Sequence, residues 1–307
     1  RPHSSARGDS DAPPPKQQKK VNTVSEFLLT LPSERKRNCF MKRLILTILS
    51  IFAIAFGGMA EGTMKTHERI AENGYPFWIY TPDGYDGTKA QPIVVFLHGR
   101  SLCGRNLNQV LRYGTLDAIK KGMNMPAFVI APQNPGEAWK PSKLMDIIEW
   151  MEANYKVDAN RIYVLGMSLG GYGTMDFAGT YPDKIAAAMA LCGGCYLKDQ
   201  TGLGELPFWI IHGTADRAVG VNESKKVVAG LQEKQLTSRL RFDWLPGASH
   251  GALARAFYLK DTYDWLFAHS LQDEGRPVEE YISIDNAILK MAYSELRELR
   301  ALVGEDD

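Results

Sequence analysis

Short apolar runs alternate with segments of helical spacing along most of this chain. The runs are four to seven residues long, and most are rich in β-branched or aromatic side chains, which is typical of buried strands. The strands predicted in this way cover residues 77–80, 92–97, 127–131, 161–166, 185–191, 207–212 and 240–245. Apolar residues that recur every three or four positions predict helices over 107–121, 142–155, 170–181, 222–235 and 252–269.

Strands that alternate with helices predict an α/β fold. Connections of this length can carry the chain to a parallel neighbouring strand, so we expect a mostly parallel sheet with helices on both faces. We expect this domain to span residues 61–270, followed by a helical extension over 271–307, in which 286–303 carries an apolar stripe. In such sheets the chemistry lies beyond the carboxyl ends of the strands.

The segment 41–60 has the pattern of a bacterial secretory signal peptide. Two basic residues precede the apolar stretch Leu44–Phe56, and small residues follow it. We therefore expect a secreted or periplasmic protein with no stable membrane span after cleavage. The alternative is a membrane anchor, because Leu44–Ala60 has 17 residues, the short limit for crossing a bilayer. Residues 1–40 are polar and proline-rich, which predicts a disordered extension or a spurious start.

The charge of the chain is unevenly distributed. Residues 61–307 carry 26 Lys and Arg against 31 Asp and Glu, whereas residues 1–60 carry 10 against 4. Affinity for nucleic acid comes mainly from the neutralisation of phosphates. A folded part with excess acidic residues therefore gives no basis for a nucleic-acid partner.

Three cysteines, Cys103, Cys192 and Cys195, lie in the predicted domain. An odd number allows at most one disulfide among them. The Cys192-Gly-Gly-Cys195 spacing can suit zinc, but no second pair of this kind accompanies it, so we predict no metal site. Two interpretations stay open: the pair packs as small residues at a strand end, or Cys103 forms a disulfide with one of its members.

Ser168 is the candidate nucleophile. It lies in Gly166-Met167-Ser168-Leu169-Gly170, a G-x-S-x-G motif between a predicted strand and a predicted helix. The glycines allow the tight turn that exposes the hydroxyl above the edge of the sheet. The N-terminus of the following helix favours the negative charge that develops during nucleophilic attack.

A serine hydroxyl needs a base to take its proton and an acid to orient that base. In this type of site the order along the chain is Ser, Asp, His. Asp216 ends the segment His212-Gly-Thr-Ala-Asp216, directly after a predicted strand, and His250 lies in a small-residue loop after the next strand. We therefore predict a triad of Ser168, Asp216 and His250.

The remaining histidines and acids fit these roles less well. His212 ends a buried strand and is interpreted as structural, whereas His98 is expected to support a loop that binds the oxyanion. The others lie within strands or away from the strand ends: His67, His269, Asp183 and Asp243. The N–H groups of Leu169 and Arg100 are the expected oxyanion donors.

Four motifs together resemble single-domain serine esterases of the α/β-hydrolase superfamily, in the phospholipase/carboxylesterase and feruloyl-esterase-like branch. They are Leu97-His98-Gly99, Gly166–Gly173, His212–Asp216 and Ser249-His250-Gly251. The resemblance covers about residues 75–267, although Arg100 stands where many members have a further glycine. It implies an α/β-hydrolase fold and hydrolysis of small-molecule or glycan esters, with acylated carbohydrates or aromatic esters as candidates.

We expect an acyl-enzyme route that needs no metal or organic cofactor. Trp139 and Tyr172 are candidates to line the substrate pocket, although ordinary packing would also explain them. The first alternative function is a serine peptidase of the prolyl-oligopeptidase type, which uses the same triad. The second is a non-catalytic binding protein.

Overall fold

The structure, a computed structural model, describes residues 62–303, with side chains as far as residue 294. The described residues all belong to one compact unit of the chain. The predicted signal peptide and the segment 1–40 lie outside the described residues. Among the described residues, no helix has both the length and the apolar character needed to cross a membrane.

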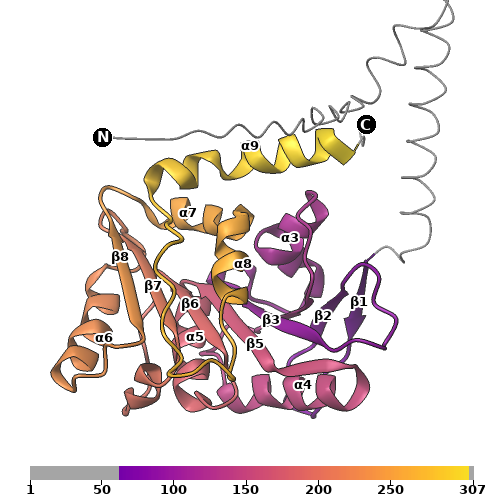
Figure 1. Ribbon diagram of the computed structural model, residues 1–307, viewed down its shortest axis with the longest axis horizontal. Coiled ribbons are helices and arrows are strands. Elements are labelled where there is room, and N and C mark those ends of the chain that lie inside the picture. Colours follow the sequence, from indigo (N-terminus) through magenta and orange to yellow (C-terminus); the bar gives the residue numbers. More distant parts are fainter. Residues whose placement is uncertain (1–61, 304–307) are drawn as a thin grey trace, which may run out of the picture. The chain divides into compact units, whose positions relative to one another are not determined.

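Eight strands form one sheet in the order β1-β2-β4-β3-β5-β6-β7-β8 (Figure 1). They are β1 (Thr63–His67), β2 (Phe77–Thr81), β3 (Gln91–Leu97), β4 (Phe128–Pro132), β5 (Val157–Met167), β6 (Ala187–Leu191), β7 (Phe208–Gly213) and β8 (Leu240–Leu245). The strands from β4 to β8 pair in parallel, and β1 and β2 are antiparallel. The predicted mostly parallel sheet is therefore confirmed.

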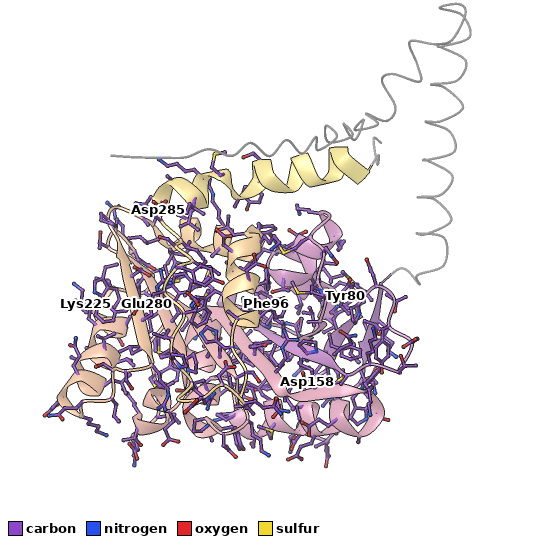
Figure 2. All side chains as sticks on the ribbon, viewed as in Figure 1. Tyr80, Phe96, Asp158, Lys225, Glu280 and Asp285 are labelled. Carbon is purple, nitrogen blue, oxygen red and sulfur yellow. The ribbon has the colours of Figure 1, made fainter. Side chains whose placement is uncertain are left out.

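Helices cover both faces of the sheet, as predicted. Successive side chains of a strand point to opposite faces, so Val94 and Phe96 enter one hydrophobic cluster while Ile93 and Val95 enter another. The first cluster includes residues from α3 (Thr115–Lys120), α8 (Lys260–Phe267) and α9 (Asn286–Val303). The second includes residues from α4 (Pro141–Asn154), α5 (Leu169–Thr180) and α6 (Asn222–Glu233). Figure 2 shows the side chains filling both layers, with Phe96 in the interior.

Three elements differ from the prediction. The expected helix over 107–121 is a 3-10 helix, Leu107–Arg112, followed by α3, because Gly114 between them has a φ of 98° that continues neither. The expected helix over 252–269 is likewise divided into α7 (His250–Leu253), a 3-10 turn and α8. Strand β1 was not predicted, because its sequence TMKTH is largely polar and its burial is slight.

The segment after α8 is tied to the edge of the sheet opposite the strands' carboxyl ends. The Arg276 guanidinium donates to the carbonyl oxygens of Pro182 (3.0 Å) and Ile185 (2.5 Å). Farther along, α9 packs through the buried side chains of Leu289 and Ala292. The predicted helix over 286–303 is therefore present, and Ile288, Leu289 and Ala292 of its apolar stripe contact the domain, whereas Met291 is exposed.

We predict that Phe96→Ala lowers the free energy of unfolding by about 3–5 kcal/mol. The ring is fully buried and lies edge-on to Phe257 at 5.0 Å between centroids, so truncation leaves a cavity in the first cluster. Urea unfolding measures the change. Tyr281→Ala is the control, because a ring that is 79% exposed should cost less than about 0.5 kcal/mol. Equal losses in the two variants would contradict the assignment of Phe96 to the core.

Candidate active site

Ser168 occupies a sharp turn between β5 and α5. Its backbone has φ 60° and ψ −123°, a combination that side-chain-bearing residues rarely adopt. The Ser168 N–H donates to the Leu191 carbonyl at 2.9 Å, and the Ser168 carbonyl accepts from the Tyr172 N–H at 3.0 Å. The strained turn is thus held by β6 on one side and by the first turn of the helix on the other.

The glycines around Ser168 are required by close backbone contacts. A Cβ on Gly170 would lie 1.8 Å from the Leu97 carbonyl oxygen, and a Cβ on Gly171 would lie 2.5 Å from the Leu191 carbonyl oxygen. Any larger residue would push α5 away from the ends of β3 and β6. The motif therefore fixes the position of the serine as well as the shape of its turn.

Asp216, the predicted acid, lies in the loop after β7 with its side chain fully buried. Its Oδ1 accepts from the N–H groups of Ala218 and Val219, both at 2.9 Å, and its Oδ2 lies 2.7 Å from His250 Nδ1. Burial alone would raise the pKa of Asp216, but these hydrogen bonds, led by that from His250, hold the pKa below its usual value. The carboxylate is therefore ionised, and it orients a proton on Nδ1.

His250 begins α7, in the loop after β8, and its side chain is 25% exposed. Because Nδ1 donates to Asp216, the neutral ring presents the lone pair of Nε2, as a general base must. His250 and Ser168 line the same cavity, whose volume is about 570 Å³. The structure therefore brings the three predicted triad residues together around one cavity, with Asp216 behind its wall.

The two predicted oxyanion donors line the same cavity as Ser168. Leu169 is the first residue of α5, and Arg100 is the first residue of the 3-10 helix Arg100–Leu102. The first N–H of a helix has no acceptor within that helix. Both N–H groups can therefore donate to a ligand in the cavity.

His98 braces the loop that carries Arg100. The ring is fully buried, its Nδ1 lies 2.8 Å from the Gly99 carbonyl, and its Nε2 accepts from the Asn134 N–H at 3.0 Å. Burial lowers the pKa of His98 to about 4, so the ring is neutral with its proton on Nδ1. Tyr113 adds a hydroxyl that accepts from the Gly99 N–H at 3.0 Å. This placement agrees with the supporting role expected for His98.

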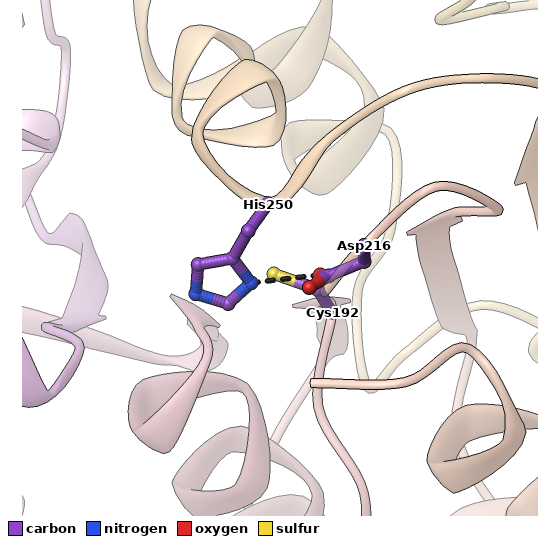
Figure 3. Close-up of side chains that lie close together, drawn as sticks. All are labelled: Cys192, Asp216 and His250. Atoms are coloured by element: carbon purple, nitrogen blue, oxygen red, sulfur yellow. Dashed lines mark hydrogen bonds and ion pairs between the residues drawn. The ribbon is translucent and has the colours of Figure 1, made fainter. Parts of the chain in front are cut away.

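Cys192 lies directly beside the Asp216–His250 pair, which the sequence did not suggest (Figure 3). One ligand atom from each of the three residues lies within 4.8 Å of the others, as in some metal sites. However, burial and then the Asp216 carboxylate raise the pKa of the Cys192 thiol well above its usual value, so it stays protonated. The 2.7 Å contact between His250 and Asp216 also leaves no space for an ion between them.

Cys103, Cys192 and Cys195 are all free thiols, so the disulfide considered from the sequence is not formed. Cys192 is fully buried at the end of β6, which agrees with the alternative of small residues packing there. Cys195 Sγ instead donates to the Asp176 carboxylate at 3.4 Å.

The two candidate pocket residues have different positions. Tyr172 lines the cavity and stacks on Tyr196, with 4.6 Å between ring centroids and 20° between ring planes. Trp139 does not line the cavity: it is 2% exposed and packs edge-on against Tyr75 and His98. The expectation for Trp139 is corrected accordingly, because its ring packs in the core against Tyr75 and His98. Tyr196, which is 59% exposed, was missed because it lies in an irregular loop with no motif.

His212 was interpreted as structural, and it is fully buried. The structure adds that its Nε2 lies 3.5 Å from Asp216 Oδ2. Its position four residues before Asp216 was the one available signal for this contact. The other histidines and acids set aside from the sequence lie elsewhere: His67 in β1, Asp183 after α5, Asp243 in β8 and His269 after α8.

The sequence pattern of the Dienelactone hydrolase family matches residues 50–264 of the chain. Probable feruloyl esterase C of Aspergillus terreus is 25% identical over 159 residues, which cover 49% of this chain and 58% of that protein. Acetylxylan esterase A of Emericella nidulans is 31% identical over 90 residues, which cover 23% of this chain and 30% of that protein. The crystal structure of a thermostable esterase aligns with a TM-score of 0.57 at 25% identity, covering 68% of this chain and 63% of that one. The chain thus spans less than two thirds of each of these proteins.

We predict that Ser168→Gly is more stable than Ser168→Ala by about 1 kcal/mol. Both variants lack the hydroxyl, but glycine relieves a backbone strain of about 1–3 kcal/mol, which exceeds its entropic cost of about 0.5–1 kcal/mol. Urea unfolding of both variants gives the difference.

The control pair for this comparison is Lys290→Gly and Lys290→Ala, at an exposed position in α9. Alanine should be the more stable residue there by about 1 kcal/mol. The same order of stability at both positions would contradict strain at Ser168.

Proposed function

The chain belongs to the dienelactone hydrolase family, and from this premise we propose that it is a serine hydrolase that cleaves carboxylic esters through an acyl-enzyme intermediate. The observation that carries the proposal is the buried Asp216 carboxylate, which is 2.7 Å from a His250 ring that shares a cavity with Ser168. Both curated relatives are named as esterases, which supports the same reaction class.

In the proposed route, Ser168 Oγ attacks the ester carbonyl carbon while His250 Nε2 takes the hydroxyl proton. The imidazolium that forms is stabilised by the Asp216 carboxylate. His250 then returns the proton to the leaving alcohol as the carbon–oxygen bond breaks. A water molecule that gives its proton to His250 attacks the acyl-enzyme, and release of the acid restores Ser168.

The negative charge of each tetrahedral intermediate would be held by the N–H groups of Leu169 and Arg100. Leu169 adds the favourable field at the N-terminus of α5. Such preorganised donors stabilise charge without reorganising during the reaction, which makes them a large part of catalysis. The route uses no metal or organic cofactor.

We propose that the substrates are small-molecule or glycan esters that carry a ring, such as acylated carbohydrates or aromatic esters. The names of the two relatives, a feruloyl esterase and an acetylxylan esterase, support this class. Tyr172 and Tyr196 line the cavity with their rings stacked on each other, and an aromatic ring or the apolar face of a sugar could pack against this pair. Export of the protein, proposed from the pattern of residues 41–60, would give access to such substrates.

We predict that the full chain hydrolyses acetyl, butyryl or feruloyl esters and that Ser168→Ala lowers kcat by about 10⁴-fold or more. The substrate panel should also include a long-chain ester and an aminoacyl anilide, with turnover measured by product release. Cleavage of the anilide alone would favour the peptidase alternative. If no substrate of the panel is turned over and a fluorophosphonate does not label the protein, the binding-protein alternative would be favoured.

We predict that Tyr196→Ala lowers kcat/KM for a feruloyl ester or an acetylated xyloside by about 2- to 12-fold, since a ring–ring contact contributes about 0.5–1.5 kcal/mol. Tyr196→Phe is the matched control, because it keeps the ring and should keep most of the activity. Steady-state kinetics on both substrates shows whether the loss in kcat/KM is larger for the aromatic ester or for the sugar ester, and so which ring packs against Tyr196. Equal losses in both variants would remove stacking as the explanation.

A further inference from the structure

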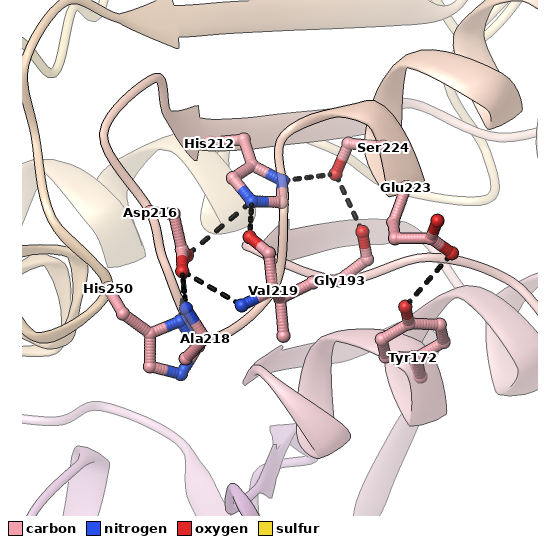
Figure 4. A network of polar contacts seen from close by, with 9 residues as sticks. All are labelled: Tyr172, Gly193, His212, Asp216, Ala218, Val219, Glu223, Ser224 and His250. Carbon is pink, nitrogen blue, oxygen red and sulfur yellow. Dashed lines mark hydrogen bonds and ion pairs between the residues drawn. The ribbon is translucent and has the colours of Figure 1, made fainter.

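The turn after β7 is held by a second histidine, His212. His212 Nε2 lies 2.9 Å from the Val219 carbonyl oxygen and 3.5 Å from Asp216 Oδ2 (Figure 4). A carbonyl oxygen and an ionised carboxylate are acceptors only. A lone pair on Nε2 would face both of them, so Nε2 must carry a hydrogen, which it donates to Val219.

The contacts of the other ring nitrogen are compatible with this conclusion and bear on the charge of the ring. His212 Nδ1 lies 2.7 Å from Ser224 Oγ, which is also 2.7 Å from the Gly193 carbonyl oxygen. The hydroxyl has one hydrogen. If that hydrogen goes to Gly193, Nδ1 must donate to Ser224 and the ring is a cation beside Asp216; if it goes to Nδ1, the ring is neutral. In both arrangements Nε2 keeps its hydrogen.

We propose that His212 is a positioning residue for Asp216. The Val219 carbonyl that it binds belongs to the same turn whose N–H groups, at Ala218 and Val219, hold Asp216 Oδ1. Fixing this turn leaves Oδ2 directed at His250. The role rests on the proposed function, because the Asp216–His250 pair is what it serves.

Loss of the His212 imidazole would affect the site in two ways. The partly buried Val219 carbonyl would lose its donor, so the turn could move and the Asp216–His250 hydrogen bond would weaken. A weaker bond stabilises the protonated His250 less. The other titratable or charged groups around this turn are Arg217, which lies in it and is exposed, Cys192, which stays protonated, and Glu223, which is bound to Tyr172 on the cavity side.

The test compares His212→Ala with His212→Gln in steady-state kinetics on an acetyl ester. We expect His212→Ala to lower kcat on the order of 10- to 100-fold, as for an unpaired buried polar group, with a smaller change in KM. The acidic limb of the pH profile of kcat/KM should move to lower pH. Glutamine can place an N–H near the position of Nε2, so His212→Gln should recover most of kcat and the original limb.

His269→Ala is the matched control for the loss of a buried imidazole. That ring is 2% exposed and is bound by Trp265 and Glu279, away from the cavity. We expect this variant to lose stability without changing kcat or the pH profile. Equal effects of His269→Ala and His212→Ala would overturn the proposal. So would an unchanged acidic limb in a folded His212→Ala, or a His212→Gln that is no better than His212→Ala.

A second measurement does not depend on activity or on the folding of the alanine variant. ¹⁵N NMR of wild-type protein labelled at histidine reports which ring nitrogens carry hydrogen, and His212→Gln assigns the His212 signals by difference. A protonated Nε2 that persists across the stable pH range supports the proposal. An unprotonated Nε2 overturns it, whatever the protein hydrolyses. If Nε2 is protonated but no ester is turned over, the proposed function would be contradicted. The His212–Val219 contact would still be established.

Discussion

The close approach of α5 to the carboxyl ends of β3 and β6 is the contact on which the site depends. Gly170 lies so near the Leu97 carbonyl that even a methyl group would overlap it. This contact forces Ser168 into its strained turn, and the packing of the sheet and helices offsets that strain. Because the helix cannot retreat, the Leu169 N–H and the Ser168 hydroxyl are fixed on the same cavity as the loop that carries Arg100.

Hydrogen bonds explain how a carboxylate can be buried beside the cavity. Burial of Asp216 opposes its charge, yet two backbone N–H groups and His250 donate to it. Burial raises the pKa of the neighbouring Cys192 thiol, which stays protonated, and burial lowers the pKa of His212, whose ring lies against the same carboxylate. Of the two rings beside the ionised acid, His250 makes the closer contact, which orients that ring as a general base requires.

The sequence predicted the sheet and the grouping of Ser168, Asp216 and His250 because both follow from local rules. Buried strands must be apolar, and a strained turn at a crowded sheet edge must contain glycine. Features set by tertiary contacts were not predictable. Strand β1 is polar and is defined by its pairing with β2 alone, and the ring of Trp139 points to the core for reasons that depend on Tyr75 and His98, which are distant in sequence. Cys192 reaches Asp216 only because β6 and β7 are neighbours in the sheet.

The candidate catalytic residues and the cavity-lining residue Tyr196 are held by different kinds of contact. Ser168 and Asp216 are fixed by glycine contacts and by backbone donors at the ends of strands, where a small displacement would weaken the hydrogen bonds that define their roles. Tyr196 lies exposed in a loop, its N–H donates to the Asp176 carboxylate and its ring stacks on Tyr172, so the side chain can change with little effect on the turn at Ser168. Loops tolerate substitution better than the elements they connect. Substitution at Tyr196 could therefore alter this wall of the cavity while the arrangement of Ser168, Asp216 and His250 stays as it is, which explains why the motifs indicate the reaction class more readily than the substrate.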